Sequence, residues 1–104
     1  MFVKKTETQS RKLPGVEMFN YLTSESGTSI SVARGELDGV HPESVSEKTD
    51  RCYIFINGTA EVSVGDEKYT VSKLDVVYVP KGIRHSLKGK ATYFIINNPP
   101  FKRT

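Results

Sequence analysis

Hydrophobic and polar residues alternate most regularly between Arg51 and His85. Four short runs rich in Val, Ile, Tyr and Phe are separated by turn-forming residues at 57–58, 65–66, 72–74 and 80–82. Alternation at a period of two, with breaks about every eight residues, is typical of consecutive antiparallel strands. Asn-Gly and Gly-Asp pairs supply the positive φ angles of tight turns, and proline ends a strand because it has no N–H to donate. This block therefore predicts four strands joined by turns.

The sequence on both sides of the block predicts further short strands. We expect an edge strand at residues 2–5 and a loop at residues 6–15. Three more runs predict strands at 16–22, 28–37 and 91–97, with a polar turn at 88–90 before the last. About eight or nine strands with this spacing, and no clear helix, are typical of a sandwich or barrel, because closure leaves no sheet edge unprotected.

A polar segment at residues 38–50 interrupts these strands. It contains Gly39, Pro42 and one of the two histidines, His41. Long polar segments inside compact β domains are more often functional than simple connections, since loops carry many binding and catalytic residues. We therefore expect a functional loop at 38–50.

Composition and charge exclude several classes of protein. The chain has 104 residues, enough for one hydrophobic core but not for two. No apolar run reaches the roughly 20 residues that a membrane-spanning helix needs, and the N-terminus lacks the apolar core of a secretory signal. The net charge is only +3, with much of the excess near the two ends, so we expect neither a nucleic-acid partner nor a membrane partner. Cys52 is the only cysteine, which excludes an internal disulfide and favours the cytoplasm.

The second half of the chain carries a family motif. The segment Pro80-Lys81-Gly82-Ile83-Arg84-His85 matches the centre of the second cupin motif, which runs Gly, five residues, Pro-x-Gly, two residues, His, three residues, Asn. Leu74-Asp75 stands where the family usually has Gly-Asp, and Gly89 stands in place of the Asn. Counting back from Gly58, Arg51 replaces the Glu of the first motif. Over residues 28–97 the chain thus resembles the cupin superfamily, in its small conserved-barrel form.

The resemblance implies an all-β fold, the double-stranded β-helix or jelly-roll barrel. It implies a single cupin domain over residues 1–104, with an edge strand and loop at 1–15, the barrel at 16–97 and a tail at 98–104. It also implies a homodimer, since small cupins commonly form one. A fold of this kind hosts many functions, so the function has to be argued from the site.

The resemblance also implies a place where related proteins hold a metal. Metal-binding cupins bring a His-x-His pair, a Glu and a further His together inside the barrel, and only His85 has a clear counterpart here. A set of His85, His41 and Glu47 would suit Fe, Mn, Ni or Zn. Against this set, a permanent charge on Arg51 about 4–5 Å from a divalent ion would be repulsive by several kcal/mol at an effective dielectric of about 20. We therefore expect no cofactor.

The same residues predict a site for an anion. Arg51 presents a planar fork of donors suited to carboxylate or phosphate, and the ring nitrogens of His85 can donate hydrogen bonds. Strand alternation places Tyr53 on the same face as Arg51. We therefore expect Arg51, Tyr53 and His85 to bind a small-molecule ligand, anionic or sugar-like. The alternative is that Arg51 simply pairs with Asp50 or Glu47 at the barrel mouth.

Two other functions remain open. A metal-free isomerase or epimerase would use His85 as general base and Tyr53 or Tyr78 as general acid, and a metal-dependent form would be a dioxygenase or isomerase. A structural protein would have a barrel filled by its own side chains. No nucleophile elbow, Gly-rich phosphate loop or Cys–His pair at a plausible spacing is present.

Overall fold

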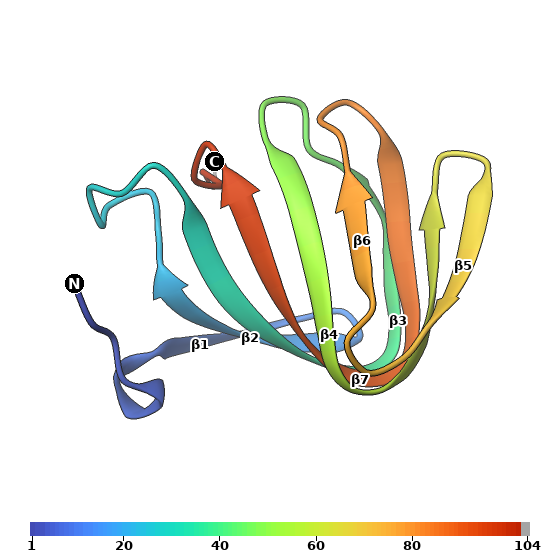
Figure 1. Cartoon of the computed structure of the whole chain (residues 1–104), viewed down its shortest axis with the longest axis horizontal. Coiled ribbons are helices and arrows are strands. Elements are labelled where there is room, and N and C mark those ends of the chain that lie inside the picture. The colour runs from blue at the N-terminus through green and yellow to red at the C-terminus, as the bar shows by residue number, and fades with distance from the viewer. Residues whose placement is uncertain (103–104) are drawn as a thin grey trace.

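The protein is built from one strongly curved antiparallel sheet (Figure 1). The structure is a computed structural model that describes residues 1–102. A short 3₁₀ helix, η1 (Lys5–Glu7), precedes the strands. The strands are β1 (Gln9–Leu13), β2 (Val16–Leu22), β3 (Ser31–Val45), β4 (Asp50–Val64), β5 (Glu67–Val71), β6 (Val76–Val79) and β7 (Arg84–Asn98). In the sheet they follow the order β1-β2-β3-β7-β4-β5, and β6 pairs with the first part of β4. The predicted all-β fold is confirmed.

The three longest strands bend back on themselves, which closes the sheet around its inner face. Strands β3, β4 and β7 have 15 residues each. Their bends lie side by side, because Gly39 of β3 pairs with Gly89 of β7, and Gly89 in turn pairs with Ala60 of β4. Gly39, Gly58 and Gly89 have φ values of 122°, 81° and 142°, a region that side chains with a Cβ rarely adopt.

Strict alternation along the strands places the core inside the bend. In β7, every second residue from Ala91 to Asn97 is buried, and the residues between them are half-buried. The buried aromatic residues Tyr53, Phe55 and Tyr93 pack against one another, with ring centroids 5.2–6.4 Å apart. Gly35 makes room for one of them, since a Cβ there would lie 2.3 Å from the ring of Tyr93.

Two of the predicted turns are wrong. Asn57-Gly58 and Lys88-Gly89-Lys90 were expected to separate strands, whereas each lies inside a long strand and bends it. A glycine with positive φ serves a bend within a strand as well as a hairpin turn, so the residue type alone does not distinguish the two. The strand at 16–22 and the turn at 65–66 are confirmed.

The expectations for two other segments are also wrong. Residues 2–5 form no strand, and the expected loop at 6–15 contains β1, whose polar sequence shows no alternation because none of its residues is fully buried. The expected functional loop at 38–50 is mostly a continuation of β3 to Val45, and only 46–49 form the connection to β4. This second half of β3 is exposed after the bend at Gly39, so its polar composition reflects a solvated strand.

Within residues 1–102, the only helix is the single turn of η1, and no helix there has the length and apolar composition to cross a membrane.

The bend in β4 gives a test of this architecture. A Cβ added to Gly58 would lie 2.2 Å from the backbone oxygen of Lys90, on top of the strain of its positive φ. We expect Gly58→Ala to lower the free energy of unfolding by more than about 2 kcal/mol, because a backbone atom cannot move away without disturbing the β4–β7 pairing.

The matched control is Gly27→Ala. Gly27 also has a positive φ, 75°, but a Cβ there meets nothing within 4 Å, so only the backbone strain of about 1 kcal/mol should remain. Urea denaturation of both variants measures the difference. An equal loss of stability in the two variants would show that the close strand contact at Gly58 is unimportant.

Candidate functional site

A cavity of about 490 Å³ lies against the inner face of the sheet. Its walls are inward-facing side chains of β1, β2, β3, β4 and β7, and Phe101 of the C-terminal tail closes part of it. Its lining mixes apolar and polar side chains, and its volume falls in the range of small-molecule sites. The inner face of the sheet therefore borders an open space large enough for a small molecule.

Polar side chains enter the cavity in one row across the sheet. Ser31 of β3, Asn97 of β7 and Arg51 of β4 are direct cross-strand partners. The row below them consists of Ala33, Ile95 and Tyr53, paired in the same way. The register thus places one polar layer above an apolar and aromatic layer.

Arg51 is the only member of this row that carries a charge. Its Nε is buried and has no hydrogen-bond partner. Its Nη1 lies 3.4 Å from Nε2 of His85, and the ring of Phe101 covers its guanidinium at 4.7 Å from the ring centroid. Arg51 forms no ion pair within residues 1–102, so the alternative pairing with Asp50 or Glu47 is not present there.

His85 lies directly beside Arg51, and its surroundings favour the neutral ring. Burial lowers the pKa of His85, the nearby charges of Arg51 and His41 lower it further, and the hydrogen bond to the Ile83 carbonyl offsets part of this effect. Since a carbonyl only accepts, the 3.2 Å contact with Ile83 places the ring proton on Nδ1. The lone pair of Nε2 then accepts from the Arg51 guanidinium.

Two tyrosines form the floor of the cavity. Burial raises the pKa of the Tyr53 hydroxyl, and the positive charge of Arg51 offsets only part of this rise. Burial also raises the pKa of Tyr93, whose hydroxyl donates to Sδ of Met18 at 3.7 Å. Both phenols therefore keep their protons at neutral pH and can act as donors or packing surfaces.

The three residues expected to hold a metal are not brought together. His41 lines the cavity, and its Nδ1 donates to the Pro14 carbonyl at 2.9 Å, whereas Glu47 is exposed in the connection after β3. Within residues 1–102, no three His, Cys, Asp or Glu side chains are grouped so that they could share a metal ion. Because Arg51 also lies against Nε2 of His85, the donor set does not fit a metal.

Tyr78 lies on the other side of the sheet from the cavity. In β6, Val77 and Val79 face inward, while Tyr78 is 57% exposed and pairs with Cys52 on the outer face. The structure brings Arg51, Tyr53 and His85 together. It leaves Tyr78 outside, because alternation along β6 directs Val77 and Val79 inward and Tyr78 outward.

Several cavity residues were not singled out from the sequence. Asn97, Ser31 and Phe101 come from strand ends and the tail, and Arg11 comes from β1, which was expected to be a loop. Asn97 could have been found, because alternation along the last strand gives it the same inward phase as Tyr93 and Ile95. Phe101 and Arg11 could not, since the sequence alone gives no signal that these segments lie beside the cavity.

Comparison with known proteins bears on the fold. No protein-family model matches the sequence, and no curated protein matches it either. Solved structures do match. A protein from Planctomyces limnophilus has a TM-score of 0.90 and 21% sequence identity, over 98% of this chain and 90% of that one. Streptomyces Pac13, a nucleoside dehydratase also solved with uridine, has a TM-score of 0.87 and 18% identity, over 98% and 84% of the two chains.

A third similar structure belongs to a longer enzyme. Oxalate decarboxylase from Bacillus subtilis, which has Mn(II) centres, gives a TM-score of 0.84 and 18% identity, and the match covers 98% of this chain but 30% of that one. At identities this low, the similarity concerns the fold alone. The fold predicted from the sequence motif is confirmed: this chain has the fold of a small cupin barrel.

Proposed function

We propose that the protein binds a small anionic ligand in its barrel cavity, with Arg51 as the anchor. The observation that carries the proposal is the partly buried guanidinium of Arg51, which lines the cavity and forms no ion pair within residues 1–102. A charged group taken out of water without a counter-charge is costly. A carboxylate or phosphate in the cavity would supply that counter-charge through charge-assisted hydrogen bonds.

The charges around the cavity support an anion over a cation. A second arginine, Arg11 of β1, also lines the cavity. The one carboxylate in the lining is Glu25, which is exposed in the connection after β2. The lining thus contains two arginines and one carboxylate, which favours an anionic ligand.

The aromatic floor and His85 complete the proposed site. Tyr53 and His85 lie with ring centroids 6.2 Å apart, both next to Arg51. Tyr53 offers a phenol proton and an apolar ring face, so a ligand with a compact apolar body and an anionic end would match the two layers of the cavity. The ligand of Pac13, uridine, is one example of a small molecule bound by a protein of this fold.

A metal-free acid–base enzyme is a second candidate. The observation that favours it is the neutral ring of His85, whose lone pair on Nε2 lies next to the proposed anchor. In this scheme a bound anion draws the Arg51 guanidinium away from Nε2, the neutral imidazole then removes a proton from the ligand, and the protonated phenol of Tyr53 donates one. Tyr78 has no part in this scheme because it lies on the outer face.

Replacement of the anchor tests the binding proposal. Glycolate, acetate and inorganic phosphate serve as probes, and affinity is measured by calorimetry on the wild type and Arg51→Ala. We expect Arg51→Ala to weaken binding of the best probe by about 10- to 100-fold, because a charge-assisted hydrogen bond contributes about 1.5–3 kcal/mol.

The matched control is Arg84→Ala. Arg84 neighbours His85 but is exposed and pairs with Asp66 at 2.6 Å on the outside. Its loss should leave probe binding unchanged. If both variants weaken binding equally, the effect is one of overall charge and Arg51 is not the anchor.

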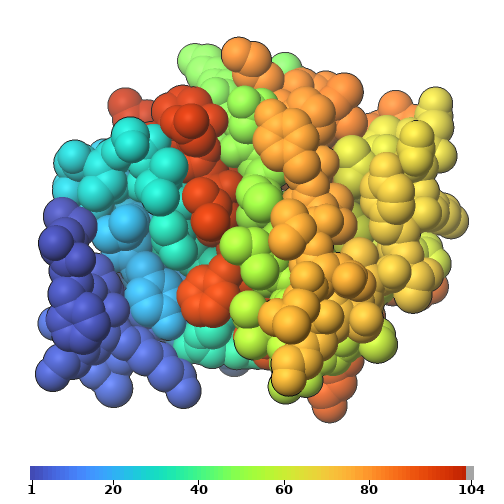
Figure 2. Space-filling view, in the orientation of Figure 1, coloured from blue at the N-terminus to red at the C-terminus, as the bar shows by residue number. Residues whose placement is uncertain are grey.

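We also propose that the protein is a homodimer that associates through the outer face of the sheet. Figure 2 shows segments of β3, β7, β4 and β6 next to one another across the surface, from cyan through red and green to orange. Paired rows of apolar residues cross this face, and its edge strand β6 exposes Val76 by 59%. These rows contain Phe19, Phe94, Ile96, Ile54, Val76 and Tyr78.

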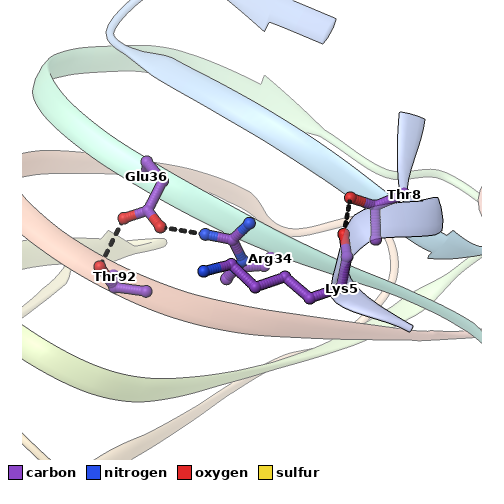
Figure 3. A network of polar contacts seen from close by, with 5 residues as sticks. All are labelled: Lys5, Thr8, Arg34, Glu36 and Thr92. Atoms are coloured by element: carbon purple, nitrogen blue, oxygen red, sulfur yellow. Dashed lines mark hydrogen bonds and ion pairs between the residues drawn. The ribbon is translucent and has the colours of Figure 1, made fainter. Parts of the chain in front are cut away.

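The outer face also carries charged residues, and Figure 3 shows one pair of them. Arg34 forms an ion pair with Glu36 and stacks on Phe19 at 4.3 Å from the ring centroid. The other carboxylate oxygen of Glu36 accepts from Thr92 at 2.5 Å. A largely apolar face is suited to a partner of the same character, and a second copy of the chain always presents one.

A charge placed in the outer face tests the dimer. Val76→Asp should convert the dimer to a monomer, because a carboxylate would be buried without a partner, and size-exclusion chromatography with light scattering measures the mass. Lys73→Asp, in the exposed turn before β6, should remain dimeric. A wild type that is monomeric at micromolar concentration would contradict the proposal.

We further propose that residues 1–104 form one domain of a cytoplasmic protein. β1 belongs to the same sheet as the barrel strands, which supports one unit that includes the N-terminal segment. Residues 103–104 of the expected tail lie outside the described residues. The free thiol of Cys52 is suited to a reducing compartment.

A further inference from the structure

Strand β1 directs a second arginine into the cavity. Gln9, Arg11 and Leu13 line the cavity, whereas Ser10 and Lys12 between them are exposed and do not. Leu13 packs against the hydrophobic core on the same face. Arg11 is half-buried there and forms no ion pair within the described part of the chain. A half-buried charge on the inner face of a strand, without a counter-charge, favours a ligand that supplies one.

The other polar side chains of the lining supply no further permanent positive charge. Most of them are amides and hydroxyls, and several are bonded within the protein. Asn20 donates to the Gln9 carbonyl at 3.5 Å, and Ser31 accepts from the Phe101 N–H at 3.1 Å. The ring of His41 already donates to a backbone carbonyl at 2.9 Å. These groups can add hydrogen bonds to a ligand, but the two arginines determine which charge it carries.

The one carboxylate of the lining, Glu25, does not neutralise Arg11. Glu25 lies in the exposed connection after β2, whereas Arg11 pairs with Met18, four residues before the end of that strand at Leu22. No ion pair joins the two side chains within the described residues. Because an exposed carboxylate is well solvated and largely screened, it offsets little of the attraction for an anion at Arg11.

The two arginines lie in different rows of the inner face. The row that begins at Arg11 crosses the sheet through successive pairing partners: Met18, Gly35, Tyr93 and Phe55. Arg51 lies four residues before Phe55 on β4, an offset of about 13 Å along the strands at about 3.3 Å per residue. Contacts with His85 and Phe101 hold the Arg51 guanidinium at its end of the cavity. This offset favours two separated anionic groups over a single one.

From this arrangement we propose that the ligand is a dianion with two separated anionic groups, of which Arg51 binds one and Arg11 the other. The row between the two arginines contains Ala33, Ile95 and Tyr53, so the part of the ligand that joins its two ends is apolar. Dicarboxylates of medium chain length have this composition. Arg11 is then the residue that distinguishes a dianion from a monoanion. This inference rests on the proposed function, binding of an anion by Arg51.

The test compares dicarboxylates with monocarboxylates of the same chain length: succinate, adipate and suberate against butyrate, hexanoate and octanoate. Calorimetry at neutral pH on the wild type should show, at the length that fits, the dicarboxylate bound about tenfold or more tightly, because its second carboxylate gains charge-assisted hydrogen bonds. In Arg11→Ala this preference should disappear, while the affinity for the monocarboxylate stays unchanged. Arg11→Gln, which keeps a long polar side chain without the charge, should show the same loss.

The matched control is Lys12→Ala. Lys12 follows Arg11 in β1 but is exposed and does not line the cavity, so its replacement removes the same charge outside the site. The preference for the dicarboxylate should remain in this variant. Since β1 is an edge strand, an inward charge could instead serve only to prevent pairing with other chains. In that case replacement of Arg11 would leave both affinities unchanged, which would overturn the inference.

The outcomes separate this inference from the proposed function. If no dicarboxylate binds more tightly than its monocarboxylate, and Arg51→Ala weakens binding of both, the anion site stands and the role of Arg11 is overturned. A preference that persists in folded Arg11→Gln, or that is lost equally in Lys12→Ala, also overturns the role of Arg11. If no carboxylate binds to the wild type, this inference and the proposed function are both overturned.

Discussion

The architecture depends on three long strands that reverse direction without leaving the sheet. Each bends at a glycine, and the bends are in contact because Gly39 pairs with Gly89 across β3 and β7. At Gly58, the backbone of the next strand occupies the place that a side chain would need. This close approach folds the sheet over its own apolar face. The inward rows of β3, β4 and β7 then surround a space instead of forming a flat layer.

The position of Arg51 follows from the same geometry. Its pairing with Asn97 on one side and Val79 on the other places it in the inward row nearest the tail, where the cupin motif has a glutamate. A glutamate there would help to hold a cation, whereas a guanidinium both repels a cation and occupies the space next to Nε2 of His85. We propose that this one difference from the motif changes the charge that the cavity accepts, while the fold and the histidine remain. The fold alone says little about function, and the sign of the charge in the cavity says more.

The family motif and strand alternation predicted the fold and the central part of the site. Alternation is strong where one face is buried, so the inward directions of Arg51, Tyr53 and His85 could be predicted before the structure was known. It is absent where both faces are solvated, which is why β1 and the second half of β3 were taken for loops. Tyr78 was placed in the cavity wrongly, because the sequence did not establish which residues of its strand face inward. The contribution of Asn97 and Phe101 depends on register and on the path of the tail, and neither has a local sequence signal.

The most direct test of the central claim, that a guanidinium stands where related proteins place a metal, is elemental analysis. The protein should be purified without a chelator and without a metal-affinity tag, and iron, manganese, nickel and zinc measured against subunit concentration. We expect each metal well below one equivalent per chain, in the wild type and in His85→Ala alike. Close to one equivalent of any of them, lost in His85→Ala, would contradict the claim and show that His85 binds a metal despite the neighbouring Arg51.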